Sequence, residues 1–248
     1  ARQWLGAGLK FLHGSFGDSQ VLQQIGQFKP DFILLDLGVS SHQLDADGRG
    51  FSFRRSTALD MRMDRRSVLT AAELLNSSAE GELADLFRRY ANERRSVGLA
   101  REIVRRRRTK PLRTSDDLVG AIRAVLGSRS GPADFARLFQ AVRIAVNREL
   151  EELSSALPVL RGALEVEGTL TVISYHSGED RIVKQMFSNW AKSCICPPRQ
   201  PVCTCRGRSL GTRSPRKPIT AAPDEVVRNR RSRSAKLRVF RKAHDVEG

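Results

Sequence analysis

The stretch that decides the fold runs from Asp31 to Asp64 and reads DFILLDLGVSSHQLDADGRGFSFRRSTALDMRMD. It opens with an unbroken apolar run from Phe32 to Leu35, which is the pattern of a buried strand. The strand ends at Asp36, and a long loop rich in Gly, Ser, Asp and Arg follows. Open α/β sheets bind ligands at the carboxyl ends of their strands, and so long a loop is uncommon unless it is functional. Asp36 is therefore the first candidate site residue, with a plain acidic turn as the alternative.

The apolar spacing on both sides of this stretch predicts an α/β fold. A short strand over 10–12 and a helix over 19–27 should precede the central strand, and a second strong strand is expected over 170–174. The other segments expected towards the C-terminus are a helix over 182–190, a loop over 207–229 and an outer strand over 236–240.

Residues 70 to about 164 have almost wholly helical spacing. Thr70 with Glu73 fits a capping box at a helix start, and so does Ser77 with Glu80. The last of these helices is expected to run from about Pro132 through Leu153. The spacing alone indicates only that these helices pack against something.

The composition indicates a basic, globular chain. Its 248 residues and 40% apolar share can form one large domain or a domain with an insertion. The formal net charge is +16, and the segment from Arg206 onward holds 13 Lys+Arg against 4 Asp+Glu. Such a charge predicts a polyanionic partner, with an unspecialised basic surface as the alternative. The sequence has no membrane-spanning apolar run and no signal-peptide pattern, so we expect a cytoplasmic protein.

The cysteines stand together as C-x-C-x6-C-x-C, at Cys194, Cys196, Cys203 and Cys205. This clustering differs from a disulfide framework and fits a reducing cytosol. Zinc sites usually contain C-x2–4-C pairs, so the C-x-C spacing is a weaker match. The sequence therefore favours a loop of free thiols or an occasional disulfide, and no metal ligand is assigned.

The segments DLGVSSHQLD, GRGFSF and LDMRMD, in this order, closely resemble the bacterial and organellar family of 16S ribosomal RNA cytosine-N4 methyltransferases. Three further segments resemble signatures of the same family: FQAVRIAVNRELEEL (139–153), SYHSGEDRIV (174–183) and RSRSAKLRV (231–239). The resemblance implies a Rossmann-like methyltransferase sheet with an inserted all-helical domain and S-adenosylmethionine as cofactor. It also implies methyl transfer to the exocyclic N4 of a cytidine in the 16S rRNA of the small ribosomal subunit, in the decoding region. Neither a membrane nor DNA is expected as a partner.

On this resemblance, residues 1–69 form the first part of the methyltransferase domain. Residues 70–164 form an inserted helical RNA-recognition domain, and 165–248 form the second part with a basic C-terminal region. The family's first two strands, with their glycine-rich cofactor loop and ribose-binding acid, have no counterpart before Lys10. We therefore expect an N-terminally truncated member with an incomplete sheet that is inactive alone. The alternative is a divergent protein that has lost cofactor binding.

The resemblance also implies roles for individual residues. Phe16, Asp36 and Gln43 would bind the cofactor, and Asp36, Ser174 and His176 would be catalytic. A carboxylate at position 36 can accept hydrogen bonds from the cofactor, and Phe16 can stack on its adenine. His176 can position the cytosine or receive its proton, because histidine titrates near neutral pH. The alternative for Phe16 is an ordinary core or turn aromatic, for Gln43 a solvent-facing loop amide, and for His176 a structural histidine. Where relatives usually carry Phe and Leu, this chain carries Tyr175 and Gly178.

Aromatic side chains beside arginines suit an unstacked RNA base. The expected RNA-binding residues are Arg49, Phe51, Phe53, Arg230, Arg231, Arg233 and Lys236. Arg228 and Arg238 are also placed to meet phosphates. Core packing of Phe51 and Phe53 is the alternative for the aromatic pair.

Two other function classes remain open. A non-catalytic RNA-binding protein derived from the same family would keep the basic surface. A DNA N4-cytosine methyltransferase is disfavoured, because such enzymes carry a Pro-Pro-aromatic run where this chain has Leu37-Gly38-Val39.

Overall fold

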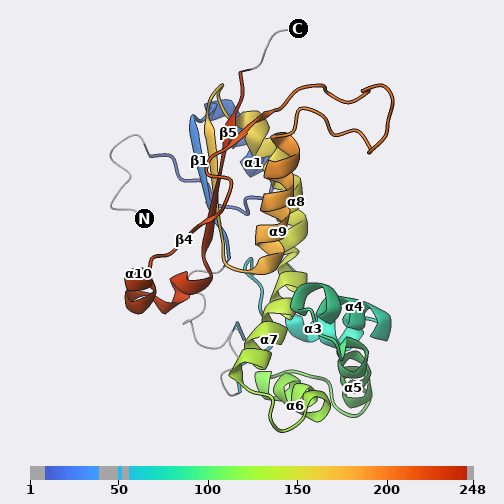
Figure 1. Ribbon diagram of the computed structural model, residues 1–248. Coiled ribbons are helices and arrows are strands. Elements are labelled where there is room, and N and C mark those ends of the chain that lie inside the picture. The colour runs from blue at the N-terminus through green and yellow to red at the C-terminus, as the bar shows by residue number, and fades with distance from the viewer. Residues whose placement is uncertain (1–8, 39–49, 52–55, 245–248) are drawn as a thin grey trace. The chain divides into compact units, whose positions relative to one another are not determined.

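The computed structural model describes residues 9–38, 50–51 and 56–244 (Figure 1). By its internal contacts the chain forms two compact units, one of residues 1–38 with 150–248 and one of residues 39–149. We call them the sheet unit and the helical unit and describe each by itself. None of the described helices is both long and apolar enough to span a membrane.

The sheet unit holds a mixed sheet, which confirms the α/β class. The strand order is β1-β2-β5-β3, and β4 also pairs with β5. The strands are β1 (Phe32–Asp36), β2 (Thr169–Ser174), β3 (Gly211–Arg213), β4 (Ile219–Thr220) and β5 (Lys236–Lys242). β1 and β2 are parallel, with Phe32 opposite Thr169 and Asp36 opposite Ile173. β5 is antiparallel to β2 and places Lys236 opposite Ser174.

Helices complete this unit, and their apolar faces form its core with the strands. The helices are α1 (Ser19–Phe28), α8 (Glu149–Ala163), α9 (Ser177–Trp190), α10 (Pro223–Arg228) and the 3-10 helix η2 (Arg230–Ser234). Trp190 of α9 packs edge-on against Phe240 of β5, with ring centroids 5.2 Å apart. Phe187 completes this aromatic group. This aromatic group fixes α9 against β5.

Three expectations for this unit were wrong. Residues 10–12 form no strand, because no described segment offers them a hydrogen-bonding partner. The expected loop over 207–229 contains β3, β4 and α10. β5 is an inner strand, flanked by β2 and β3. Its alternating basic residues misled the assignment, because the cation at Arg238 is buried against Asp180, 2.7 Å away.

The helical unit contains α3 (Ala71–Ser77), α4 (Glu80–Ala91), α5 (Ser96–Thr109), α6 (Ser115–Leu126) and α7 (Pro132–Asn147). Their buried faces share one core that includes Leu83, Phe87, Leu99, Ile122 and Val142. Thr70 and Glu73 form the predicted capping box of α3. The second predicted box was wrong: Ser77 ends α3 and donates to the Glu73 carbonyl, and the Ala79 N–H at the start of α4 donates to Glu82.

The long helix expected from Pro132 to Leu153 is broken. α7 ends at Asn147, and Arg148 takes a left-handed conformation with φ of 50° before α8 begins. α8 then contributes Leu153 and Leu157 to the core of the sheet unit. The contacts therefore divide the chain after Glu149, whereas the sequence-based boundary lay after residue 164.

Candidate active site

The carboxyl ends of two parallel strands meet at one edge of the sheet. Asp36 ends β1 and Ser174 ends β2, and the Leu37 N–H donates to the Ile173 carbonyl just beyond the strand pairing. Asp36 is exposed at this edge. Such an edge is where open α/β sheets bind their ligands. We call it the carboxyl edge.

Tyr175 fixes the carboxylate of Asp36. Its hydroxyl donates a hydrogen bond of 2.9 Å to Asp36 Oδ1. Burial and this hydrogen bond raise the pKa of Tyr175 to about 12. No donor among the described residues reaches the second carboxylate oxygen, so Asp36 presents an oriented acceptor. The tyrosine that distinguishes this chain from the family pattern thus has a defined contact.

His176 caps helix α9. Its Nδ1 accepts hydrogen bonds from the backbone N–H groups of Gly178, at 3.1 Å, and Glu179, at 3.4 Å. An imidazole that accepts at Nδ1 carries its proton on Nε2 when neutral. That nitrogen is buried and 3.2 Å from Glu179 Oε1, but it is not aligned for a hydrogen bond with any described residue. The neutral His176 ring can therefore donate a hydrogen bond only through Nε2, because Nδ1 already accepts hydrogen bonds from the start of α9.

Gly178 and Glu179 support this cap. A Cβ on Gly178 would lie 3.0 Å from the His176 ring, so glycine gives the ring room above the helix end. The buried Glu179 carboxylate accepts from the Tyr175 N–H at 2.9 Å. Burial raises its pKa, but the adjacent His176 ring and the hydrogen bonds from the Tyr175 and His176 backbone N–H groups outweigh burial and hold that pKa below its usual value. The SYHSGED segment is thus a tight strand-to-helix turn.

Ser174 and Phe16 face the protein interior. The Ser174 hydroxyl is buried and donates to the Lys236 carbonyl of β5 at 3.3 Å. Phe16 is half-buried, packed with Ile33 and Leu35 against the sheet-unit core. It precedes α1, which a three-residue connection reverses into β1, so Phe16 lies towards the carboxyl edge. The packing of Phe16 is that of the core aromatic named above as its alternative.

Gln43, Arg49 and Phe53 lie outside the described residues. Phe51 is described and half-buried. The neighbouring Gly50 has φ of 70°, and a Cβ there would lie 2.2 Å from the Ala58 carbonyl oxygen. The GRGFSF segment therefore requires glycine at this close backbone approach.

Basic residues approach the carboxyl edge from η2. This short helix leads into β5, which Figure 1 labels. The first residue of β5, Lys236, lies opposite Ser174. η2 turns Ser232 inward and leaves Arg230, Arg231 and Arg233 exposed. These three arginines are the η2 arginines below. They could meet a polyanion near Asp36.

Two other residues expected to contact phosphates, Lys236 and Arg238, are already paired with a carboxylate. Asp180 of α9 accepts from Arg238 at 2.7 Å and from Lys236 at 3.2 Å. Burial opposes ionisation of Asp180, but these two cations outweigh it and lower the pKa of its carboxyl. Arg238 is buried, so its expected phosphate contact was wrong. Lys236 stays partly exposed, with its charge partly compensated.

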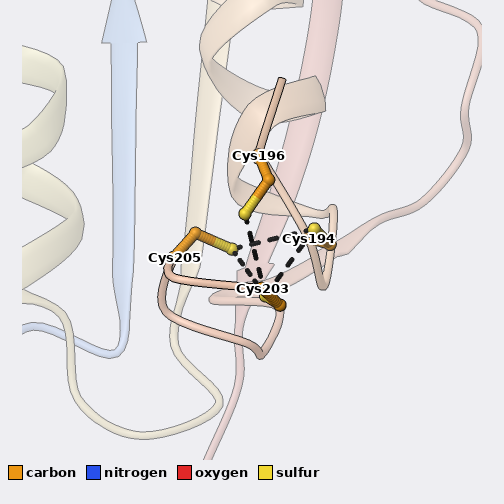
Figure 2. A group of neighbouring side chains, drawn as sticks. All are labelled: Cys194, Cys196, Cys203 and Cys205. Atoms are coloured by element: carbon orange, nitrogen blue, oxygen red, sulfur yellow. Dashed lines mark hydrogen bonds between the residues drawn. The ribbon is translucent and has the colours of Figure 1, made fainter. Parts of the chain in front are cut away.

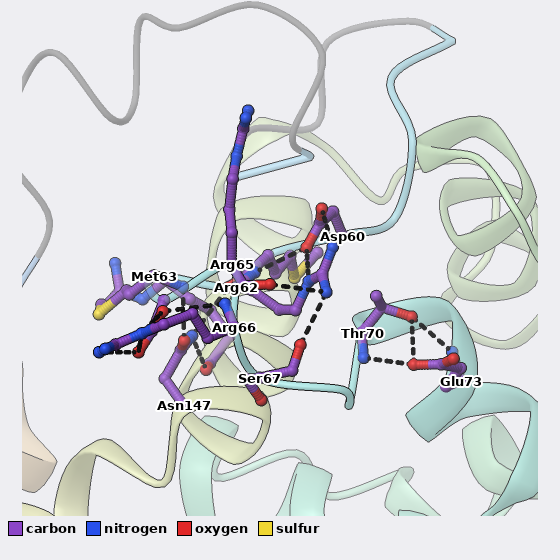
Figure 3. A network of polar contacts seen from close by, with 12 residues as sticks. Asp60, Arg62, Met63, Arg65, Arg66, Ser67, Thr70, Glu73 and Asn147 are labelled. Atoms are coloured by element: carbon purple, nitrogen blue, oxygen red, sulfur yellow. Dashed lines mark hydrogen bonds and ion pairs between the residues drawn. The ribbon is translucent and has the colours of Figure 1, made fainter.

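In the helical unit, Asn147 connects two of the sequence signatures (Figure 3). Its side-chain amide donates to the Met61 carbonyl at 2.8 Å and accepts from the Met63 N–H at 2.7 Å. Met61 is fully buried with φ of 58°, and Asp60 holds Arg62 through contacts of 2.6 and 3.0 Å. Sequence reasoning missed Asn147, although it stands inside FQAVRIAVNRELEEL. The feature that could have identified Asn147 is that its polar amide stands in the middle of the helix predicted from Pro132 to Leu153.

Comparison with known proteins gives one consistent answer. The profile described as the MraW methylase family matches residues 3–243. A protein of Gemmatimonas aurantiaca named ribosomal RNA small subunit methyltransferase H is 60% identical over 213 residues, covering 86% of this chain and 68% of its own. A protein of the same name from Heliobacterium mobile is 48% identical over 226 residues, covering 90% and 72%. A third, from Trichlorobacter lovleyi, is 44% identical over 237 residues, covering 93% and 75%.

Proposed function

Since this chain belongs to the MraW methylase family, we propose that it is a methyltransferase of small-subunit ribosomal RNA. We further propose that it takes the methyl group from S-adenosylmethionine and transfers it to N4 of a cytidine in the decoding region of 16S rRNA. The names of its relatives support the RNA substrate. The cytidine, its N4 atom and the decoding region rest on the resemblance of the sequence motifs.

The observation that carries this proposal is the geometry of Asp36. It is an exposed carboxylate at the carboxyl edge, with one oxygen held by Tyr175 and the other without a described donor. This acceptor fits the cofactor that the family implies, and Phe16 and Gln43 would complete its binding. S-adenosylmethionine, when bound, supplies a methyl group on a positively charged sulfur.

The protein's task is mainly alignment. The N4 lone pair of cytosine is delocalised into the ring, so N4 is a poor nucleophile. A site accelerates the displacement by holding N4, the methyl carbon and the sulfur in line. An acceptor for an N4 hydrogen would also increase its nucleophilicity.

The histidine tautomer restricts the roles that can be proposed for His176. Its Nδ1 holds the start of α9, so accepting the N4 proton there would break the cap. Since Nε2 is buried, we therefore propose that His176 positions the turn at the start of α9 and does not contact the base. Asp36 is then a better candidate than His176 to accept a hydrogen bond from the cytosine N4 at the carboxyl edge.

The proposal predicts a defined chemical product. The complete reading frame should be expressed in a bacterium whose own small-subunit methyltransferase H is deleted, and the nucleosides of its 16S rRNA should be analysed by mass spectrometry. We expect N4-methylated cytidine to appear. Methylation at carbon 5 or on another base would contradict the N4 assignment. Unmodified rRNA with retained, salt-sensitive RNA binding would favour the non-catalytic alternative suggested by the exposed η2 arginines.

A further inference from the structure

Four cysteine sulfurs converge in the loop between α9 and β3. Cys194 and Cys196 come from its outgoing arm, and Cys203 and Cys205 come from its returning arm. Figure 2 shows their side chains pointing toward one another, and all four sulfurs lie within 4.8 Å of one another. We call this group the cysteine cluster. It holds every cysteine of the chain.

The distances suit one metal ion. The sulfur pairs 194–203 and 196–203 are 3.8 Å apart, 203–205 is 3.5 Å, and 194–205 is 3.9 Å. Zinc binds thiolates at about 2.3 Å in a tetrahedron, so its ligand sulfurs are separated by about 3.8 Å. All four cysteines are free thiols, and no pair is close to the bonded sulfur distance of about 2.05 Å. An iron–sulfur cluster would separate its cysteines further, because cluster atoms stand between them.

The loop explains how C-x-C can supply such ligands. Neither arm is helical, and in a non-helical segment residues i and i+2 can point to the same side. The chain reverses where the Gln200 N–H donates to the Pro197 carbonyl, which brings the two arms together. Each arm then contributes two sulfurs to the same space. The x2–4 spacing needed in a tight turn is therefore not required here.

Other contacts hold the arms in this arrangement. The Gln200 amide donates to the Val202 carbonyl at 2.9 Å and to the Thr204 hydroxyl at 2.7 Å. The Arg206 guanidinium donates to the Asn189 carbonyl and, at 2.9 Å, to the Lys192 carbonyl, so the loop closes onto the end of α9. The Ile195 N–H points at Cys205 Sγ, 3.3 Å away, as backbone donors do around metal thiolates.

We propose that the cysteine cluster binds one Zn²⁺ ion in a structural site. Four thiolates with no open position make a closed site, which stabilises a fold and performs no chemistry. The ion would order a loop that has little apolar burial of its own, since Ile195 and Val202 are exposed. The site is separate from Asp36, so the zinc proposal and the methyltransferase proposal stand or fall independently.

The direct test is metal content. Chain purified under reducing conditions should hold about one zinc per molecule by mass spectrometry of the elements, and the Cys194→Ser/Cys205→Ser variant should hold at least about tenfold less. Ser193→Ala, which changes the exposed hydroxyl beside Cys194, is the matched control and should keep its zinc. Circular dichroism of each variant shows whether the rest of the chain is folded.

Protease resistance gives a second readout. Zinc should slow tryptic cleavage after Arg199, and a strong chelator should restore cleavage in the wild type but change nothing in the double serine variant. The proposal is overturned if the folded protein neither contains nor takes up zinc. It is also overturned if stoichiometric iron occupies the site, or if non-reducing mass spectrometry shows a disulfide within the cluster.

Discussion

At the scale of single residues, the proposed site depends on the pair Asp36 and Tyr175. The phenol must stay protonated to donate its hydrogen bond to the carboxylate. Its pKa, raised to about 12, exceeds that of an unfolded tyrosine, which is about 10. The stabilisation from this contact is therefore fully present below pH 10 and is lost as the pH rises through about 12.

A spectroscopic titration tests this contact. The chain has two tyrosines, so Tyr90→Phe leaves Tyr175 as the only source of tyrosinate absorbance. After rapid pH jumps, we expect a midpoint near 12 in Tyr90→Phe and a lower one when Asp36→Asn is added. Burial is the largest single cause of the shift, so the midpoint should not fall all the way to the unfolded value. Identical midpoints in the two proteins would refute the contact.

The sequence located the site but did not give its side-chain directions. Asp36 was predicted from a strand end followed by a functional loop, and it does lie exposed at the carboxyl edge. Ser174 ends the neighbouring strand, yet its hydroxyl is buried against β5. That orientation depends on a strand more than 60 residues later in the sequence, since Lys236 supplies the acceptor. The cap at His176 was hidden for another reason, because histidine is not among the usual capping residues.

At the scale of elements, Asp180 links α9 to β5. It accepts from Arg238 and Lys236, and its side chain and that of Arg238 are only 12% and 10% exposed. Asp180→Asn should lower the free energy of unfolding of the sheet unit by about 1–3 kcal/mol, because it leaves a buried guanidinium without its counter-charge. Urea titration followed by Trp190 fluorescence, in a Trp4→Phe background, measures this change.

The matched control is Asp224→Asn. Asp224 pairs with Arg228 at 2.8 Å, but the two side chains are 72% and 75% exposed, so the change should stay within about 0.5 kcal/mol. The pKa of Asp180 is lowered in the fold, so its stabilisation is present above the unfolded pKa and is lost as the pH falls through the lowered value. Equal effects of both substitutions at neutral pH would contradict the buried linkage.

Long amphipathic elements were predictable and short ones were not. The apolar periodicity of α4 and the run in β1 specify their own structure. β3 and β4 have three and two residues and exist only because β5 pairs with them. The break at Arg148 left no glycine or proline to mark it. Likewise, the convergence of the two C-x-C pairs was not predictable, because spacing alone does not show that the chain reverses between them.

At the scale of the whole molecule, the charge of +16 predicts salt-sensitive RNA binding. The η2 arginines are exposed and lead into β5 at the carboxyl edge. Arg230→Glu/Arg233→Glu should reduce the log–log salt slope of RNA binding by about 0.7 for each phosphate that the variant no longer neutralises. Lys184→Glu/Lys192→Glu makes the same change in net charge at exposed lysines of α9 and its exit, and should leave the slope nearly unchanged. Equal slopes for the two variants would exclude a specific role for η2.

The two units should also differ in protection from hydrogen exchange. Among the described residues, β1 pairs only with β2, and Phe32 and Leu34 are 55% and 51% exposed. In α7, by contrast, Phe139 to Val146 lie largely within the core of the helical unit. We expect the amides of Phe32–Leu35 to exchange faster in a monomeric sample. Comparable protection of both segments would show that β1 is more stable than its described contacts imply.

We propose that methyl transfer to small-subunit rRNA takes place at the carboxyl edge marked by Asp36. The most direct test maps the methyl group in 16S rRNA from deletion cells that express the complete reading frame, comparing wild type, Asp36→Ala and Asp31→Ala. Asp31 is an exposed aspartate at the opposite end of β1, which makes it the matched control. We predict N4-methylcytidine in a decoding-region fragment for wild type and Asp31→Ala, and its loss in Asp36→Ala with RNA affinity nearly unchanged. Full methylation by Asp36→Ala, or a methyl group elsewhere in the rRNA, would contradict the account.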